Sequence, residues 1–197
     1  MSGVGDVNLS VEGRPLGEKG LVDRAKNGDV SAYTELVRAH QGIALRLAYL
    51  VLRDASEAED ATQEAFMKAY RALGRFRPEA EFRPWLLRIV RNEALNRRRS
   101  ARRRAGLAVK LASDPVLADA ALSPEAAVVR DEDRRHLLEA VTALPWRLRE
   151  VIECRYFLGL SEAETALALG VPAGTVKSRS ARAIGLLRMI TETSTGG

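Results

Sequence analysis

The sequence predicts an all-α fold, with two small helical domains joined by a flexible linker, and three observations lead to it. Apolar residues recur at spacings of three and four along several stretches, as on the buried face of an amphipathic helix. No stretch shows the alternation that a half-buried strand requires. Charge divides the chain, because residues 20–104 carry 18 Lys/Arg against 11 Asp/Glu and residues 134–190 carry nine against five, whereas residues 105–133 carry two against six.

These shifts in composition set the expected boundaries. A first domain covers residues 20–104 and a second covers residues 124–191, with an acidic and apolar linker at 105–123 between them. The first 19 residues hold four glycines and show no periodicity, so we expect a disordered lead there. Residues 192–197 form a tail.

Helix starts and stops in the first domain follow from residues that favour helix ends. The signals, in chain order, are a stop near Gly28, an N-cap at Asp29 or Ser31, a capping box of Ser56 with Glu59, a C-cap at Gly74, and Pro84 in the first turn of a long helix.

The second domain has its own signals. They are, in chain order, a helix start at Ser123-Pro124-Glu125, a break at Leu144-Pro145, a helix from Trp146 to Leu158 ended by Gly159, a capping box of Ser161 with Glu164, a turn at Gly170, and a last helix from Pro172 to about Ile190. The short helix, the glycine turn and the last helix together form a helix-turn-helix, whose second helix enters the major groove of DNA.

The last helix carries donors and no acid before Glu192. We expect it to read DNA through five residues: Thr175, Lys177, Ser178, Arg179 and Arg182. An ordinary helical hairpin within a bundle is the alternative, which the lack of acids disfavours.

Two charged clusters lie in the first domain. Six of the eight residues from Arg97 to Arg104 are arginines. Such a run is often only a solvated segment, but here it ends a helix that also carries Arg88 and Arg91, so we expect phosphate binding. Residues 54–64 hold five carboxylates and no cation. For these acids alone, a solvated helix start is the preferred interpretation.

Four aromatic residues receive separate interpretations. Trp85 and Trp146 sit among aliphatic residues and are expected in the core. Phe76 and Phe82 flank a short loop, from which they can stack on an unpaired base.

Catalysis, metal binding and membrane insertion find no support. His40 and His136 are isolated, and Cys154 has no base at helical reach, so we expect no cofactor and interpret Cys154 as a small buried residue. A single cysteine excludes an intrachain disulfide and favours a reducing compartment. No apolar run is long enough to span a membrane, and the N-terminus lacks a signal-peptide pattern, so we expect a soluble, cytoplasmic protein.

Three motifs in this order carry a resemblance to a known family. They are AEDATQEAF at 58–66, FRPWLLRIVRNEALN at 82–96 and GVPAGTVKSR at 170–179. With them the chain resembles the extracytoplasmic-function sigma factors, small two-domain members of the bacterial sigma-70 family, over about residues 20–104 and 134–190. The resemblance implies a promoter-specificity subunit of RNA polymerase without catalytic activity.

The resemblance also implies partners and roles for residues. The first domain would dock on the clamp coiled coil of the largest polymerase subunit through Asp60, Gln63 and Glu64, and the β flap of the core would be a further contact. The promoter −10 element, with one base flipped out, would be bound by Lys68, Ala72, Phe76, Ile89, Asn92 and Asn96. DNA phosphates would contact Arg88, Arg91, Arg97, Arg98, Arg99 and Arg155. The −35 element would be read by the five donors of the last helix, and an anti-sigma protein is an expected further partner.

The sequence departs from the family at two places. Ser180 stands where Leu or Ile is usual and falls on the apolar stripe of its helix, and Ala181 replaces a larger residue. The loop around Glu79 is variable in such proteins, so the −10 base and the −35 preference do not carry over. Two rival functions stay open: a stand-alone helix-turn-helix regulator, and an RNA-binding adaptor that uses the arginine cluster.

Overall fold

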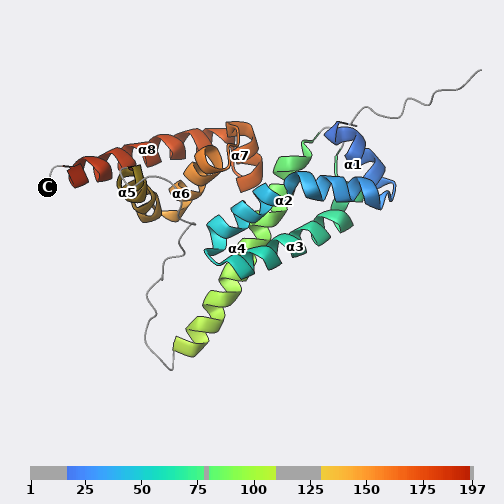
Figure 1. Cartoon of the computed structure of the whole chain (residues 1–197), viewed down its shortest axis with the longest axis horizontal. Helices are drawn as coiled ribbons and strands as arrows, with labels where there is room; N and C mark the ends of the chain where they lie inside the picture. Colours follow the sequence, from blue (N-terminus) through green and yellow to red (C-terminus); the bar gives the residue numbers. More distant parts are fainter. Residues whose placement is uncertain (1–16, 78–79, 110–129, 196–197) are drawn as a thin grey trace, which may run out of the picture.

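Helices make up most of the described structure, and short turns join them (Figure 1). The computed structural model describes residues 17–77, 80–109 and 130–195, and no strand occurs within these ranges. The first domain contains α1 (Glu18–Lys26), α2 (Val30–Leu52), α3 (Ala55–Ala72), the 3-10 helix η1 (Leu73–Arg75) and α4 (Phe82–Val109). The second contains α5 (Arg130–Ala143), α6 (Trp146–Ile152), the π-helix η2 (Glu153–Phe157), α7 (Glu162–Leu169) and α8 (Ala173–Thr195). The prediction of an all-α fold is confirmed.

The core of the first domain lies where α2, α3 and α4 pack on one another. Asp29 is the N-cap of α2, and its carboxylate accepts hydrogen bonds from the backbone N–H groups of Ser31 and Ala32. Of the two caps expected from the sequence, Asp29 is therefore the one used. In the helix that begins here, the expected apolar stripe, which includes Leu36 and Leu47, faces the core.

Both predicted ends of α3 need correction. Its N-cap is Asp54, whose side chain accepts from the N–H of Glu57, so Ser56 and Glu59 already lie within the helix and form no capping box. At the other end the chain tightens into η1, closed by a bond from the Phe76 N–H to the Leu73 carbonyl. Gly74 lies inside η1 and lacks the positive φ of a C-capping glycine.

The fourth helix is longer than predicted. It begins at Phe82, so Pro84 lies in its first turn as expected, and it continues to Val109. It thus takes up residues 105–109, the first part of the expected linker. Ala105, Leu107 and Ala108 favour helix, and their propensity outweighs the unfavourable Gly106 in this extension. The rest of the linker and the predicted helix start at Ser123 lie outside the described residues, as do residues 1–16 of the predicted lead.

The second domain follows its predicted signals closely. Ser161 and Glu164 make the reciprocal bonds of a capping box at the start of α7. Gly159 and Gly170 have φ values of 63° and 66°, a conformation that glycine adopts without strain. Gly170 thereby lets the chain reverse between α7 and α8. The helix predicted from Trp146 to Leu158 is present as α6 and η2 in succession.

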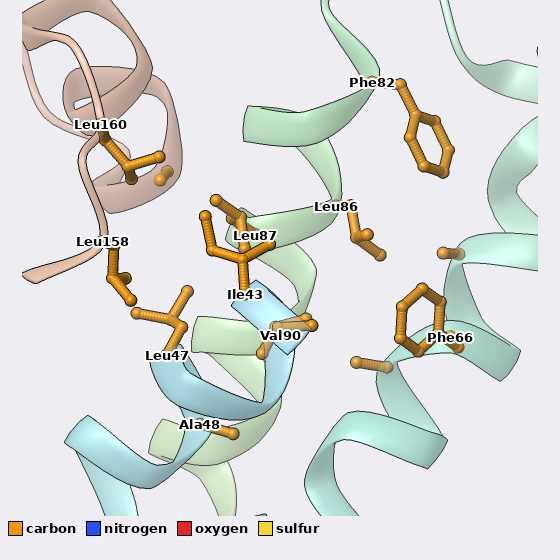
Figure 2. Packing of buried hydrophobic residues seen from close by; sticks show 14 of the residues in the cluster. Ile43, Leu47, Ala48, Phe66, Phe82, Leu86, Leu87, Val90, Leu158 and Leu160 are labelled. Atoms are coloured by element: carbon orange, nitrogen blue, oxygen red, sulfur yellow. The ribbon is translucent and has the colours of Figure 1, made fainter. Parts of the chain in front are cut away.

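The two domains share an apolar cluster. Residues of α2 and α4 lie in one cluster with residues of η2, α7 and the start of α8. Figure 2 shows Leu158 and Leu160 of the second domain facing Leu87 of α4. A smaller, separate cluster fills the space between α5, α6 and α8. None of the described helices is long and apolar enough to cross a membrane.

Candidate nucleic-acid interface

The N-terminal half of α8 presents a cationic surface. Lys177, Ser178 and Arg182 are exposed, whereas Thr175 and Arg179 are half-buried. Val176 is fully buried and anchors the helix from beneath. Because α7 is held by its capping box and the Gly170 turn, α8 projects at a fixed angle, as recognition by a helix in a groove requires.

The two family departures lie on this helix. Ser180 is half-buried, in agreement with its predicted place on the apolar stripe, and Ala181 is exposed. A methyl group at Ala181 offers no hydrogen bond to a base edge, so this position can make only apolar contact with one.

A stripe of polar side chains runs along α4. Arg88, Asn92, Asn96 and Arg99 recur every three or four residues and are all exposed, so they lie on one side of the helix. The predicted −10 asparagines and two of the predicted phosphate-binding arginines are thus brought together. Arginine suits phosphate and asparagine suits a base edge.

Three other predicted phosphate ligands are engaged with the protein itself. Arg91 pairs with Glu150 of α6 at 2.6 Å. Arg97 lies 3.3–3.5 Å from carboxylates of α3 and α4. Arg98 lies over the ring of Trp146, 5.6 Å from its centroid, and donates to a carbonyl of α2.

Arg155 and Trp146 also differ from simple expectation. Arg155 is half-buried and donates to the Leu160 carbonyl at 2.5 Å, which fixes the turn after η2. Trp146 was predicted in the core but is 41% exposed. The guanidinium groups of Arg98 and Arg147 lie near its ring, so a cation–π contact replaces burial.

The predicted stacking aromatics lie beneath the surface. Phe76 and Phe82 are 5% and 2% exposed. Their ring centroids are 6.0 Å apart, and Trp85 lies 4.9 Å from Phe76 and 5.6 Å from Phe82. His40 packs on Phe82 at 5.5 Å, and burial lowers the pKa of its imidazole. In this conformation both phenylalanine rings pack in the core of the first domain, and their contact with an unpaired base stays a prediction.

The remaining predicted −10 residues are dispersed around this aromatic cluster. Lys68 is exposed, and its ammonium group lies 2.5 Å from a carboxylate oxygen of Glu93. Ala72 and Ile89 are half-buried. The structure thus gathers the polar members of the set on α4 more tightly than the apolar ones.

The acidic face of α3 borders a groove that sequence reasoning missed. Asp60 and Gln63 are exposed and Glu64 is half-buried. Beside them, α2 and α3 enclose a groove of about 850 Å³. Exposed apolar residues line it: Val30, Leu45, Met67 and Tyr70. The signal was present, because Met67 and Tyr70 share the helix side of Gln63 at spacings of four and seven.

Nothing in the described part of the chain is arranged for metal binding. No group of three His, Cys, Asp or Glu side chains converges there. Burial raises the pKa of the Cys154 thiol to about 12, which keeps it in its unreactive protonated form at neutral pH. The Cys154 side chain is buried, as predicted.

Comparisons with known proteins agree with this arrangement. The family model described as Sigma-70 region 2 matches residues 36–104, and the one described as Sigma-70, region 4 matches residues 134–187. The RNA polymerase sigma-H factor of Pseudomonas aeruginosa is 41% identical over 169 residues, which are 83% of this chain and 88% of that protein. The ECF RNA polymerase sigma factor SigW of Bacillus subtilis is 33% identical over 177 residues, 86% of this chain and 94% of that protein.

A solved structure has the same fold. It is the sigma factor RpoE of Bartonella quintana, in complex with the anti-sigma factor NepR. The match has a TM-score of 0.63 with 23% identity, and it covers 81% of this chain and 96% of that one.

Proposed function

The chain belongs to the sigma-70 family of RNA polymerase sigma factors, in its extracytoplasmic-function subfamily, and from that premise we propose how its surfaces divide the work. The first domain, residues 20–104, binds core polymerase and the promoter −10 element. The second, residues 124–191, binds the −35 element. The protein itself catalyses no reaction and acts in the cytoplasm.

Separation of charge on the first domain supports this division. Exposed acids lie on α3 next to the apolar groove, whereas exposed cations and asparagines lie along α4. A basic, amphipathic polymerase helix is complementary to the first surface, with Asp60, Gln63 and Glu64 at its rim. The α4 stripe is complementary to single-stranded promoter DNA.

The α8 surface supports reading of duplex DNA. Lys177, Ser178 and Arg182 are donors on a helix held by a glycine turn, and between Thr175 and Ile190 no acid opposes phosphate approach. When both domains are held on one polymerase, binding of one domain to DNA raises the effective concentration of the other at its own site. An anti-sigma protein that covers these surfaces would keep the factor inactive.

The polar stripe of α4 is the observation that carries the proposal, and transcription tests it. Run-off transcription by bacterial core polymerase on a pool of randomised promoters, with and without the protein, should yield new start sites preceded by two spaced boxes. Asn96→Ala and Arg179→Ala should abolish these starts. Arg38→Ala, which removes an exposed cation of α2 outside both surfaces, is the matched control and should leave them intact.

The same experiment separates the rivals. If core polymerase is unaffected while the protein alone shifts duplex DNA, the chain acts as a stand-alone regulator. If only RNA is bound, and binding needs the 97–104 arginines but not α8, it acts as an RNA adaptor. Either result contradicts the sigma-factor proposal.

A further inference from the structure

The contact between the two domains engages cations that the proposed function assigns to DNA. Arg91 of α4 directs two nitrogens at one carboxylate oxygen of Glu150, with Nη2 at 2.6 Å and Nε at 2.8 Å. Both side chains are only 12% exposed. The two donors converge on a single carboxylate oxygen, and the same donors suit a phosphate oxygen.

Glu150 lies at the centre of positive charge from both domains. Besides Arg91, the charges of Arg98 on α4 and of Arg179 on α8 act on its carboxylate. Desolvation nonetheless raises the pKa of Glu150, because burial outweighs these attractions. One cation proposed for promoter binding, Arg91, is therefore paired with an internal anion, and two others, Arg98 and Arg179, attract that anion electrostatically.

Further ion pairs cross the same interface. Arg53 pairs with Glu153, which is 4% exposed. Arg53 itself has a φ of 59°, a left-handed conformation that disfavours side chains other than glycine. It caps α2 in that conformation while its guanidinium reaches the second domain. Arg83 lies 3.5 Å from Glu164 of α7.

Apolar contact completes the interface. Leu87 and Val90 are fully buried on α4, and Leu158 and Leu160 lie against that side of the helix (Figure 2). The Arg88 guanidinium packs over Gly170 at the helix-turn-helix turn, 3.6 Å from where a Cβ would stand. The positive φ of 66° favours glycine there, whereas a Cβ would meet the Arg88 guanidinium only at ordinary contact distance.

We propose that the DNA-free chain rests in this closed arrangement, in which Glu150 occupies Arg91 in place of a phosphate, and that promoter binding requires the domains to separate. This inference rests on the proposed function, since it concerns the same cations. Arg91 cannot bind Glu150 and a phosphate at once, so closure and DNA binding compete. By linkage, whatever weakens closure must strengthen DNA binding.

Small-angle X-ray scattering of the full-length protein measures closure without DNA or polymerase. Glu150→Gln keeps the side-chain volume but leaves Arg91 without its anion, so the open fraction should rise about tenfold or more and the radius of gyration with it. Glu139→Gln makes the same charge change on the exposed face of α5 and should leave the radius unchanged. Leu87→Ala weakens the interface without any change of charge and should also enlarge the radius.

Fluorescence anisotropy with a labelled, random-sequence DNA duplex measures the competition. Glu150→Gln and Leu87→Ala should both tighten binding, by up to about tenfold if the closed form dominates by that ratio. Glu139→Gln measures how much tightening one lost negative charge gives by itself. Circular dichroism of each variant confirms that its helix content is retained.

The outcomes separate cleanly. An unchanged radius in both Glu150→Gln and Leu87→Ala overturns the closed resting state, even where the protein directs transcription. If Glu139→Gln tightens DNA binding as much as Glu150→Gln does, and Leu87→Ala does not tighten it, the change in affinity comes from net charge alone. That result also overturns the closed resting state. Enlarged radii of gyration together with tighter DNA binding support the proposal. They support it even if core polymerase gains no new start sites. In that case the proposed function fails and the closed resting state stands.

Discussion

Two arginines of α4 hold their carboxylate partners in very different surroundings. Arg97 is 29% exposed and reaches Glu57 and Asp60, which are 46% and 62% exposed, at 3.3 and 3.4 Å. Arg91 and Glu150 are each 12% exposed and lie 2.6 Å apart. Exposed pairs contribute little and exchange readily with other anions, whereas a buried pair is costly to break. Under the proposed function, α4 thus carries one arginine that can exchange its exposed partners for DNA readily, Arg97, and one that must first be released from a buried pair, Arg91.

The largest expected effect compares two neighbouring leucines. Leu86 and Leu87 are both fully buried, but Figure 2 shows Leu86 on the side of Phe66 and Leu87 on the side of Leu158. Leu86→Ala should lower the free energy of unfolding by about 3 kcal/mol, because the void lies inside one domain. Leu87→Ala should lower the free energy of unfolding by less, because the second domain can move away from α4 and no enclosed void then remains. Urea denaturation followed by circular dichroism measures both; equal losses with an unchanged radius of gyration would contradict the difference.

The next effect tests the buried pair. Glu150→Gln should lower the free energy of unfolding of the whole chain by about 2 kcal/mol, since Arg91 keeps its charge without a partner. The double variant Arg91→Met with Glu150→Gln should regain much of this loss, because the unpaired charge is gone. A double variant less stable than either single one would show that the pair itself, and not the unpaired charge, supplies the stability.

A smaller effect concerns pH. Burial raises the pKa of Glu153 from 4.5 to about 7, against the attraction of Arg53 and Arg149 and with the repulsion of Glu150. A carboxyl whose pKa is higher in the folded chain than in the unfolded one favours folding while it is protonated, and this contribution is lost as the pH rises from about 4.5 to about 7. The free energy of unfolding, measured by urea denaturation, should therefore fall over this range of pH. In Glu153→Gln the curve should be flat, and an unaltered pH dependence there would assign the effect to another group.

The smallest effect tests the exposed pair. Asp60→Asn should change the free energy of unfolding by less than about 0.5 kcal/mol, because Asp60 and Arg97 meet in solvent. Its consequence should appear in binding instead, as weaker association with core polymerase in a competition against the wild-type protein. A loss of stability as large as that of Glu150→Gln would mean that solvent exposure does not determine how much each of the two ion pairs contributes to the free energy of unfolding.

Much of the second domain could be predicted from local signals. The capping box of Ser161 and Glu164, and the turns at Gly159 and Gly170, depend on residues close in sequence, and all three are present. The start of α3 was predicted wrongly because two capping signals lie side by side there. Asp54 took the role expected of Ser56, and nothing local ranks one acceptor above the other.

Features that depend on distant residues escaped prediction. Arg91 and Glu150 are 59 residues apart, so no sequence spacing pairs them. The expected place of Trp146 in the core assumed that an indole among aliphatic residues is buried, but guanidinium groups from two helices lie near its ring instead. Phe76 and Phe82 turn inward because they meet Trp85 and His40, which the loop sequence does not reveal. Among the residues expected to bind the −10 element and phosphate, Arg88, Asn92, Asn96 and Arg99 do share one exposed side of α4.

Run-off transcription from one promoter selected by this protein tests the central claim most directly, with the wild-type factor, Arg91→Ala and Arg38→Ala compared on the same core polymerase. If the cations of α4 bind promoter DNA once the domains separate, Arg91→Ala should initiate far less often than wild type at saturating factor, while Arg38→Ala should match wild type. Equal initiation by all three proteins would contradict the claim, because a cation released from Glu150 would then have no role on DNA.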